Sequence, residues 1–121
     1  MRQKSRSVKE WIKFCQKNAN DHGFQIVWTR QAGPLNPIEK LMKIVSECGE
    51  AMEAYVAQTL PDTPENPINC TNWREHFDEE MADIFVRYCH MVGDLKIDIE
   101  GALEKKMKKN KKRPQKHGKL T

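Results

Sequence analysis

Carboxylate residues recur in pairs at two places in the sequence, first at Glu47 and Glu50 and then at Glu80 and Asp83. On an α-helix, the three-residue spacing within each pair places the side chains about 60° apart around the axis and roughly 4.5 Å apart along it. Two such helices lying side by side would direct four carboxylates into one small volume, where they repel one another unless a cation lies between them. Carboxylate oxygens favour hard cations. The sequence therefore predicts a site for Mg²⁺, with Mn²⁺ as the alternative metal, whose ligands are Glu47, Glu50, Glu80 and Asp83.

The same spacing also occurs on solvated helix faces, because Glu is a good helix former and charged residues commonly cover the surface. A single pair would be read as such a surface. Two pairs beside two apolar stripes are harder to explain in this way, but the residues alone leave both interpretations open.

Charge is distributed unevenly along the chain. Between Ile44 and Asp83 there are ten acidic residues and one basic residue, whereas from Lys105 to the end there are nine basic residues and no acidic one. One interpretation is a solvated basic tail that binds nucleic acid through phosphates. The other is that the carboxylates hold a metal while the tail holds the phosphates of the same ligand.

Composition limits the architecture. A chain of 121 residues with 38% hydrophobic and 31% charged residues forms one domain with a modest core, so we expect oligomerisation to bury further surface. No run of 18 apolar residues predicts a membrane span, and the basic residues within 1–13 lack the apolar segment of a signal peptide.

The four cysteines are widely spaced, which predicts reduced, mostly buried thiols in a cytoplasmic protein. A zinc site built from Cys70, His76, Cys89 and His90 would match no known ligand spacing, so we do not expect one.

Helical periodicity, capping residues and breakers predict four helices in a single domain spanning 1–121, and hence an all-α, four-helix-bundle-like fold. Residues 1–7 are expected to fray, and residues 114–121 form a basic tail that leaves the bundle. The expected helices, with their capping residues in parentheses, run from 8 to about 20 (Ser7), 37 to about 59 (Asn36), 72 to about 91 (Thr71 or Asn72) and 99 to about 113 (Asp98).

Each helix that carries a carboxylate pair also has an apolar stripe that we expect to face the core. At 100° per residue, Glu47 flanks the stripe of its helix and Glu50 lies nearly opposite it, while Glu80 and Asp83 flank theirs. A site at Glu50 therefore needs walls from elsewhere, which again favours an oligomer. The two stripes consist of Leu41, Ile44, Val45, Cys48, Met52, Tyr55 and Val56, and of Phe77, Met81, Ile84, Phe85, Tyr88 and Val92.

Further motifs follow the carboxylate pairs in a fixed order. After the Glu-Glu-Met-Ala-Asp stretch that starts at Glu79 come Ile97-Asp98, then Lys106, Met107, Asn110, Arg113 and Pro114, and a Lys-His-Gly-Lys ending from Lys116. In these motifs and their order, residues from about 38 to 119 resemble the all-α nucleoside triphosphate pyrophosphohydrolases, the superfamily of MazG, dimeric dUTPases and dCTP pyrophosphatase.

The resemblance implies an enzyme that hydrolyses a nucleoside or deoxynucleoside triphosphate to the monophosphate and pyrophosphate with Mg²⁺, and that forms homodimers or dimers of dimers. It implies catalytic roles for Glu47, Glu50 and Lys106, and leaves open which of Glu47 and Glu50 activates water. The residues for which it suggests substrate binding are Arg87, Asn110, Arg113, Lys116 and Trp73.

Several of these residues have a second interpretation. Arg87 lies one turn beyond Asp83 and either pairs with it or meets a phosphate. Trp73, like Trp28, either stacks on a base or packs against the protein. The basic residues of the last helix could instead be a solvated helix end, and Lys116 could belong to a tail without a ligand.

Two other kinds of function compete with the enzyme. One is a non-catalytic helical module that binds nucleotide or nucleic acid through the basic tail, and the other is a structural module with a solvated acidic face. The enzyme interpretation makes a small-molecule triphosphate the partner and expects neither nucleic acid nor a membrane.

Overall fold

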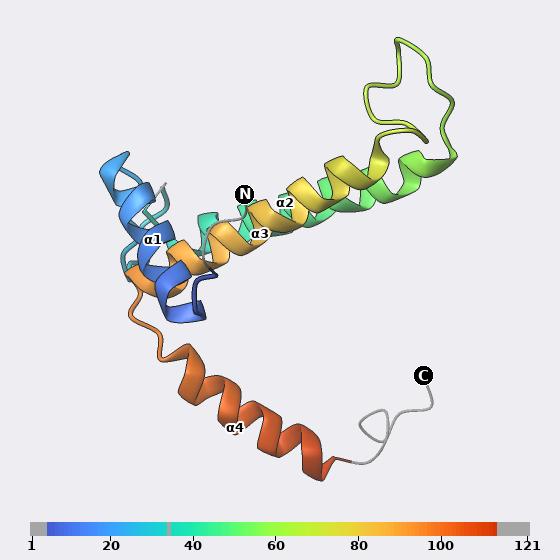
Figure 1. Cartoon of the computed structure of the whole chain (residues 1–121). Helices are drawn as coiled ribbons and strands as arrows, with labels where there is room; N and C mark the ends of the chain where they lie inside the picture. The colour runs from blue at the N-terminus through green and yellow to red at the C-terminus, as the bar shows by residue number, and fades with distance from the viewer. Residues whose placement is uncertain (1–4, 34, 114–121) are drawn as a thin grey trace.

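The structure is a computed structural model that describes residues 5–33 and 35–113. This part of the chain contains the helices α1 (Val8–Asp21), α2 (Pro37–Val56), α3 (Trp73–Asp94) and α4 (Ile99–Lys112), the short 3₁₀ helix η1 (Ala57–Thr59), and no strand. As Figure 1 shows, α2 and α3 lie side by side as an antiparallel pair and α1 packs near the end of α3. The all-α prediction is confirmed.

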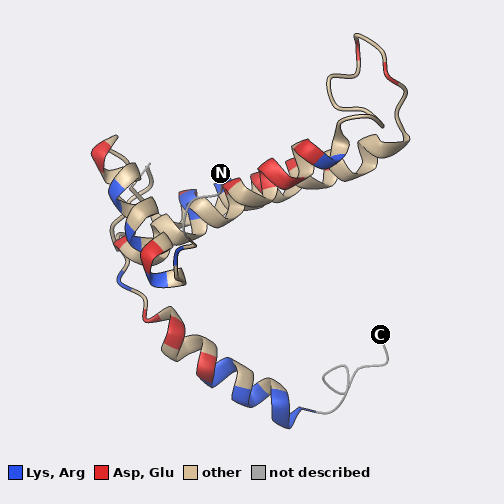
Figure 2. Ribbon diagram, viewed as in Figure 1, with Lys and Arg blue, Asp and Glu red and all other residues tan. Residues whose placement is uncertain are grey.

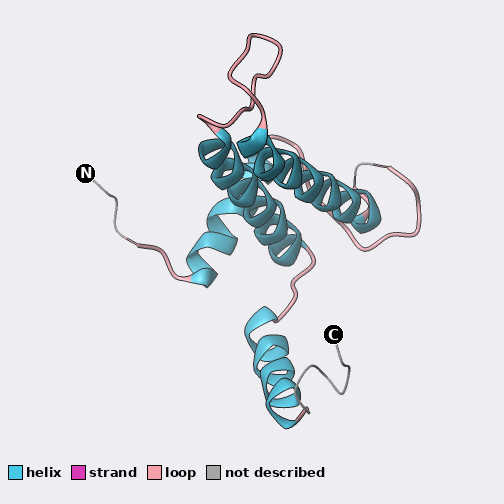
Figure 3. Cartoon of the chain, turned by 90° about the vertical axis from the view of Figure 1, so that its right-hand side faces the viewer, coloured by secondary structure: helices cyan, strands magenta, loops and turns pink. Residues whose placement is uncertain are grey.

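The fourth helix does not complete a bundle within one chain. In the views of Figures 1 and 3, α4 stands apart from the α2–α3 pair after a short turn. Its apolar residues Leu103 and Met107 are each 57% exposed. None of the helices in the described ranges has the length and apolar character needed to cross a membrane.

Local capping signals set the helix starts as the sequence predicts. Ser7 and Glu10 form a reciprocal capping box at the start of α1. The side chain of Asp98 accepts a hydrogen bond from the Gly101 amide at the start of α4. At α3, by contrast, Asn72 occupies the cap position but its side chain accepts the Asn69 amide at 2.9 Å, so it stabilises the preceding loop instead of the helix.

The expected end of α3 near Met91 is wrong, because the helix continues through Gly93 to Asp94. A Cβ atom on Gly93 would lie 2.7 Å from Oε1 of Gln16 and 3.0 Å from its Cβ. Glycine at this position therefore permits the close approach of α1 to α3, and this packing outweighs the low helix propensity of glycine.

Asp94 fastens the extended segment 24–28 to the end of α3. Its side chain accepts the Ile26 amide at 2.6 Å and the Asn20 side-chain amide at 3.0 Å, and Nε2 of His90 lies 2.9 Å from it. Ile26 is 1% exposed. It forms a buried apolar cluster with Met91 and Leu95.

The predicted core face of α2 is wrong. The residues that α2 buries are Glu47, Ala51 and Ala54, together with Lys40 near its start, whereas the large apolar residues face outward. Val45 and Met52 are 68% and 69% exposed. Much of the predicted stripe of α3 is likewise exposed, although Val92 is buried as predicted. The predicted core residues that lie exposed are Leu41, Val45, Cys48, Met52, Tyr55 and Val56 on α2, and Met81, Phe85 and Tyr88 on α3.

The cysteines follow the prediction in part. All four are free; Cys15 and Cys89 are buried and adjacent, while Cys48 and Cys70 are exposed. Among the described residues, no cysteine belongs to a cluster that could hold a metal.

Asn36 offers a direct test of how the loop and α2 depend on each other. Its Oδ1 accepts the Ile38 amide at 2.7 Å, and its Nδ2 donates to the carbonyls of Gln31 and Thr29 at 2.7 and 3.2 Å. Asn36→Ala removes the cap and leaves both carbonyls without a donor, so we expect the free energy of unfolding to fall by about 2–3 kcal/mol. Ser7→Ala, which removes an exposed cap only, should lower it by about 1 kcal/mol.

Urea denaturation at a fixed protein concentration measures both losses. An equal or smaller loss for Asn36→Ala than for Ser7→Ala would contradict this role of Asn36.

Candidate metal centre

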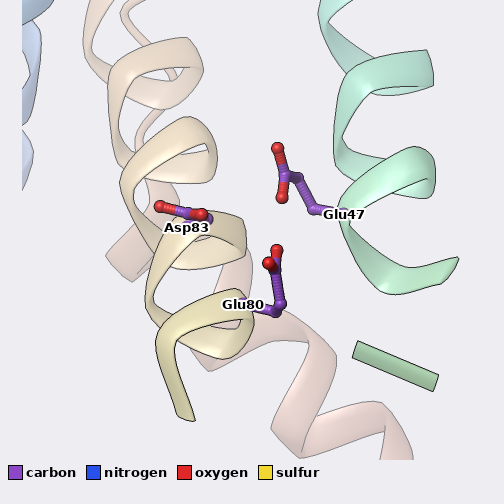
Figure 4. Close-up of side chains that lie close together, drawn as sticks. All are labelled: Glu47, Glu80 and Asp83. Carbon is purple, nitrogen blue, oxygen red and sulfur yellow. The ribbon is translucent and has the colours of Figure 1, made fainter. Parts of the chain in front are cut away.

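Three carboxylates meet where α2 and α3 face each other. Glu47 projects from α2 into the space between the helices, Glu80 extends toward it from α3, and Asp83 lies on the next turn of α3 (Figure 4). One oxygen from each side chain lies within 4.8 Å of the others. Around Mg²⁺, oxygen ligands at about 2.1 Å are at most about 4.2 Å apart, so only small side-chain rotations separate this arrangement from coordination.

Arg87 holds Glu47 in place. Its Nε and Nη2 atoms lie 3.1 and 3.0 Å from the same oxygen, Oε1, of Glu47. From its spacing, Arg87 was expected to pair with Asp83 or to meet a phosphate, whereas in the structure it pairs with Glu47 on the other helix. The Glu47 side chain is only 12% exposed, whereas that of Arg87 is 39% exposed, so the carboxylate is shielded from water and the guanidinium is partly solvated.

The remaining charge of the cluster is not balanced by protein donors. Oε2 of Glu47 and Oε2 of Glu80 are both buried without a hydrogen-bond donor in the described part of the chain. Buried carboxylate oxygens normally accept hydrogen bonds or coordinate a metal. Two such oxygens in one cluster need either a proton or a cation.

The pKa values show the effect of this crowding. A hydrogen bond with Glu47 raises the pKa of Glu80 to about 7, and burial and the charge of Glu50 add to the rise. The pKa of Glu47 is lowered, chiefly because Glu80 donates that hydrogen bond and also because Arg87 lies beside it. Protonation of Glu80 would thus supply the donor that both carboxylates lack when they are charged, and a bound cation would replace that proton.

Glu50 lies at the edge of the centre. It is exposed and does not belong to the three-carboxylate group. It nevertheless affects the pKa values of both Glu47 and Glu80, so it lies close to them. Three of the four predicted ligands are therefore brought together, and the fourth faces solvent beside them.

The predicted basic residues of α4 lie apart from the carboxylates. Lys106 borders a surface hollow together with Val8, Tyr88 and Leu103, and Asn110 lies further along the same helix. Arg113 is the C-cap residue of α4. Because α4 stands apart from α2 and α3, one copy of the chain does not bring these residues to the cluster (Figure 1). Lys116 lies outside the described residues.

Trp73 packs against the protein. Its ring centroid lies 5.7 Å from that of Tyr55 and 6.3 Å from that of Phe77 in edge-on contacts. Seven residues separate it from Glu80, which is about 10 Å along the helix. Trp73 was predicted either to stack on a base or to pack against the protein, and the structure shows it packed against Tyr55 and Phe77.

Two basic residues of α2 that were not predicted as site residues, Lys40 and Lys43, line the same cavity as Asp83 and Arg87. Lys40 lies seven residues before Glu47, two helical turns, and therefore shares its face. That spacing was visible in the sequence, but lysines near a helix start are normally read as surface residues.

Comparison with models of known protein families, with curated proteins and with solved structures gives no match.

The arrangement is chemically suited to a divalent cation. All the ligand candidates are oxygens, they come from two packed helices, and one of them is oriented by an arginine. Oxygen-only sites with several carboxylates suit Mg²⁺ or Mn²⁺.

The Glu80 proton predicts a pH-dependent stability that metal removes. The folded chain binds the Glu80 proton more tightly than an unfolded chain, in which the pKa has its ordinary value of 4.5. This contribution to the free energy of unfolding is complete below pH 4.5 and is lost as pH rises through about 7. In chelator, the melting temperature should therefore fall between pH 5 and 8, and Mg²⁺ should reduce the fall.

Glu80→Gln replaces the titrating group with a permanent donor and should flatten this part of the profile. Glu79→Gln, an exposed neighbour, should leave it as in the wild type. Superimposable profiles for wild type and Glu80→Gln in chelator would show that the Glu80 proton is absent.

Proposed function

We propose that the chain is a nucleoside triphosphate pyrophosphohydrolase that uses Mg²⁺, or Mn²⁺, to convert an NTP or dNTP to its monophosphate and pyrophosphate. The observation that carries this proposal is the cluster of Glu47, Glu80 and Asp83, in which two buried carboxylate oxygens lack a donor. The order of the sequence motifs supports the choice of triphosphate as substrate.

The roles of the carboxylates follow from their surroundings. Glu47, Glu80 and Asp83 would hold the metal, which when bound neutralises phosphate charge and lowers the pKa of a coordinated water. Arg87 keeps Glu47 deprotonated and correctly oriented. Glu50 is exposed and has no arginine partner in the described chain, so it is the better placed of the two candidates to accept the proton from the attacking water.

The reaction balances without any other reactant. Water attacks a phosphorus atom of the triphosphate, the bond between the α- and β-phosphoryl groups breaks, pyrophosphate leaves and Glu50 takes the proton. Lys106, Asn110 and Arg113 would bind the outer phosphates, which requires α4 from a second copy or a different position of α4.

A second copy is favoured by the exposed apolar faces. Val45, Met52 and Val56 on α2 are at least 60% exposed, and Met81 and Phe85 on α3 are more than 40% exposed. Apolar surface that one chain leaves uncovered marks an interface in a protein of this size. We therefore include a homodimer, or a dimer of dimers, in the proposal.

The alternative is a non-catalytic module that binds nucleotide or nucleic acid through α4. Figure 2 shows that the basic residues of α4 gather toward its C-terminal end, away from the acidic residues of α2 and α3. Such a module would bind polynucleotides with a strong salt dependence and without a metal. The pyrophosphohydrolase should bind them weakly and need a metal for turnover.

Pyrophosphate release from a panel of canonical and modified NTPs and dNTPs, with and without Mg²⁺, tests the enzyme. Activity should disappear with chelator and return with Mg²⁺. Glu50→Gln and Asp83→Asn should each lower kcat about 100-fold or more, because they remove the proton acceptor and a metal ligand.

Glu53→Gln provides the matched control, since Glu53 lies on the same helix, is exposed and is not part of the cluster. Its activity should equal that of the wild type, and circular dichroism should show all three variants folded. Full activity in Glu50→Gln and Asp83→Asn would rule out the proposed chemistry.

Light scattering tests the second copy. At micromolar concentration the wild type should have the mass of a dimer or of a dimer of dimers, where one chain is 14.1 kDa. The double variant Val45→Glu/Met52→Glu places charges on the exposed apolar face and should dissociate the assembly. Ser46→Glu, exposed on another side of α2, should not. A monomeric wild type would refute the assembly. It would also refute the binding of phosphates by Lys106, Asn110 and Arg113 from a second copy.

A further inference from the structure

A cavity of about 450 Å³ adjoins the metal centre and is walled by α1, α2 and α3. Asp83 and Arg87 line it, and both belong to the centre, so the cavity and the carboxylate cluster are contiguous. Small ligands commonly occupy cavities of roughly 300–1,000 Å³. The size and position therefore suit part of a ligand that also reaches the metal.

The lining of this cavity is cationic. Lys40, Lys43 and Arg87 contribute fixed positive charges, and His22 and His90 add two imidazoles. Among the described residues that line it, Asp83 is the carboxylate, and it lies on the side of the metal centre. Positive charge thus faces negative charge across adjoining sites.

Lys40 is the unusual residue of the set. It is only 9% exposed, and its ammonium group has no hydrogen-bond or ion-pair partner among the described residues. Its contact is with the face of the Phe24 ring, 5.4 Å from the centroid. Burial, followed by the charges of Lys43 and Arg87, lowers the pKa of Lys40, and the negative charge of Asp94 offsets only part of this effect. The side chain is thus largely covered, while Lys40 lines the cavity together with Lys43 and Arg87. Three cations that repel one another at one cavity favour the binding of an anion there.

We infer that this cavity binds the polyphosphate chain of the substrate, with Lys40 and Lys43 as phosphate ligands. The inference rests on the proposed triphosphate hydrolysis for its biological ligand. A polyphosphate fits because it carries several negative charges, which can meet these lysines at one end and the metal held by Asp83 at the other. A single carboxylate ligand would satisfy only one of these partners.

Calorimetric titration with inorganic tripolyphosphate tests the cavity without requiring turnover. The wild type should bind it in chelator, and more tightly with Mg²⁺. Lys40→Met and Lys43→Met should each weaken binding about tenfold or more in both buffers. Lys105→Met removes the same charge from an exposed position on α4 and should leave binding unchanged.

Melting temperatures separate a binding role from a structural one. Lys40→Met removes a charge that the charges of Lys43 and Arg87 disfavour, so its melting temperature should stay the same or rise while binding falls. If it unfolds at lower temperature, Lys43→Met decides the matter, because Lys43 is exposed and its replacement does not disturb packing. Tripolyphosphate binding that is absent in the wild type, retained in both cavity variants, or weakened equally in Lys105→Met would overturn the assignment.

Binding and turnover measurements distinguish failure of the cavity assignment from failure of the proposed triphosphate hydrolysis. If no triphosphate is hydrolysed but tripolyphosphate binding depends on Lys40 and Lys43, the cavity assignment stands and the enzymatic proposal falls. If Lys40→Met and Lys43→Met hydrolyse triphosphates with unchanged KM, the cavity assignment falls and the enzymatic proposal stands.

Discussion

Negative charge buried between α2 and α3 is the constraint on which this structure depends. Ala51 and Ala54 of α2 and Ala57 of η1 are buried, and small side chains such as these allow close packing against α3. In this α2–α3 interface, here called the seam, Glu47 and Glu80 occupy positions that an ordinary helix pair gives to apolar side chains. Arg87 balances part of the charge. The rest needs a proton or a cation. The stability of the helix pair and the occupancy of the centre are therefore thermodynamically linked, because binding to the folded chain raises its free energy of unfolding.

A seam of alanines and carboxylates contributes little hydrophobic free energy, because alanine buries little apolar area. The large apolar side chains of α2 lie on the outside instead, and α4 exposes its own apolar residues. In the proposed assembly, contact between these faces of different copies buries the apolar area that the α2–α3 interface does not. This division would place the chemistry inside each helix pair and the stabilising apolar contact between copies.

Features determined by neighbouring residues were predictable from the sequence, and features determined by packing were not. Ser7, Asn36 and Asp98 were identified as caps because the cap and the amide that it accepts lie within three residues. The buried face of α2 was misassigned because periodicity gives weight to large apolar residues and cannot tell a core from an interface. The end of α3 was predicted too early, near Met91, because the contact between Gly93 and Gln16 joins residues that are distant in the sequence. The carboxylate pairs were found by spacing, but Arg87 pairing with Glu47 across the helices was not foreseeable from either motif.

Taken together, the two adjoining sites limit the kind of ligand more than either does alone. The carboxylate cluster favours a hard cation, which many acidic surfaces would bind weakly. The lysine-lined cavity favours an anion, which many basic surfaces would bind too. Asp83 and Arg87 belong to both sites, so a ligand that fills them at once must present a metal ion and several negative charges within one small molecule. A metal-bound polyphosphate has this pattern of charge, whereas a free metal ion, a simple carboxylate or an uncharged metabolite would leave either Glu80 or Lys40 uncompensated.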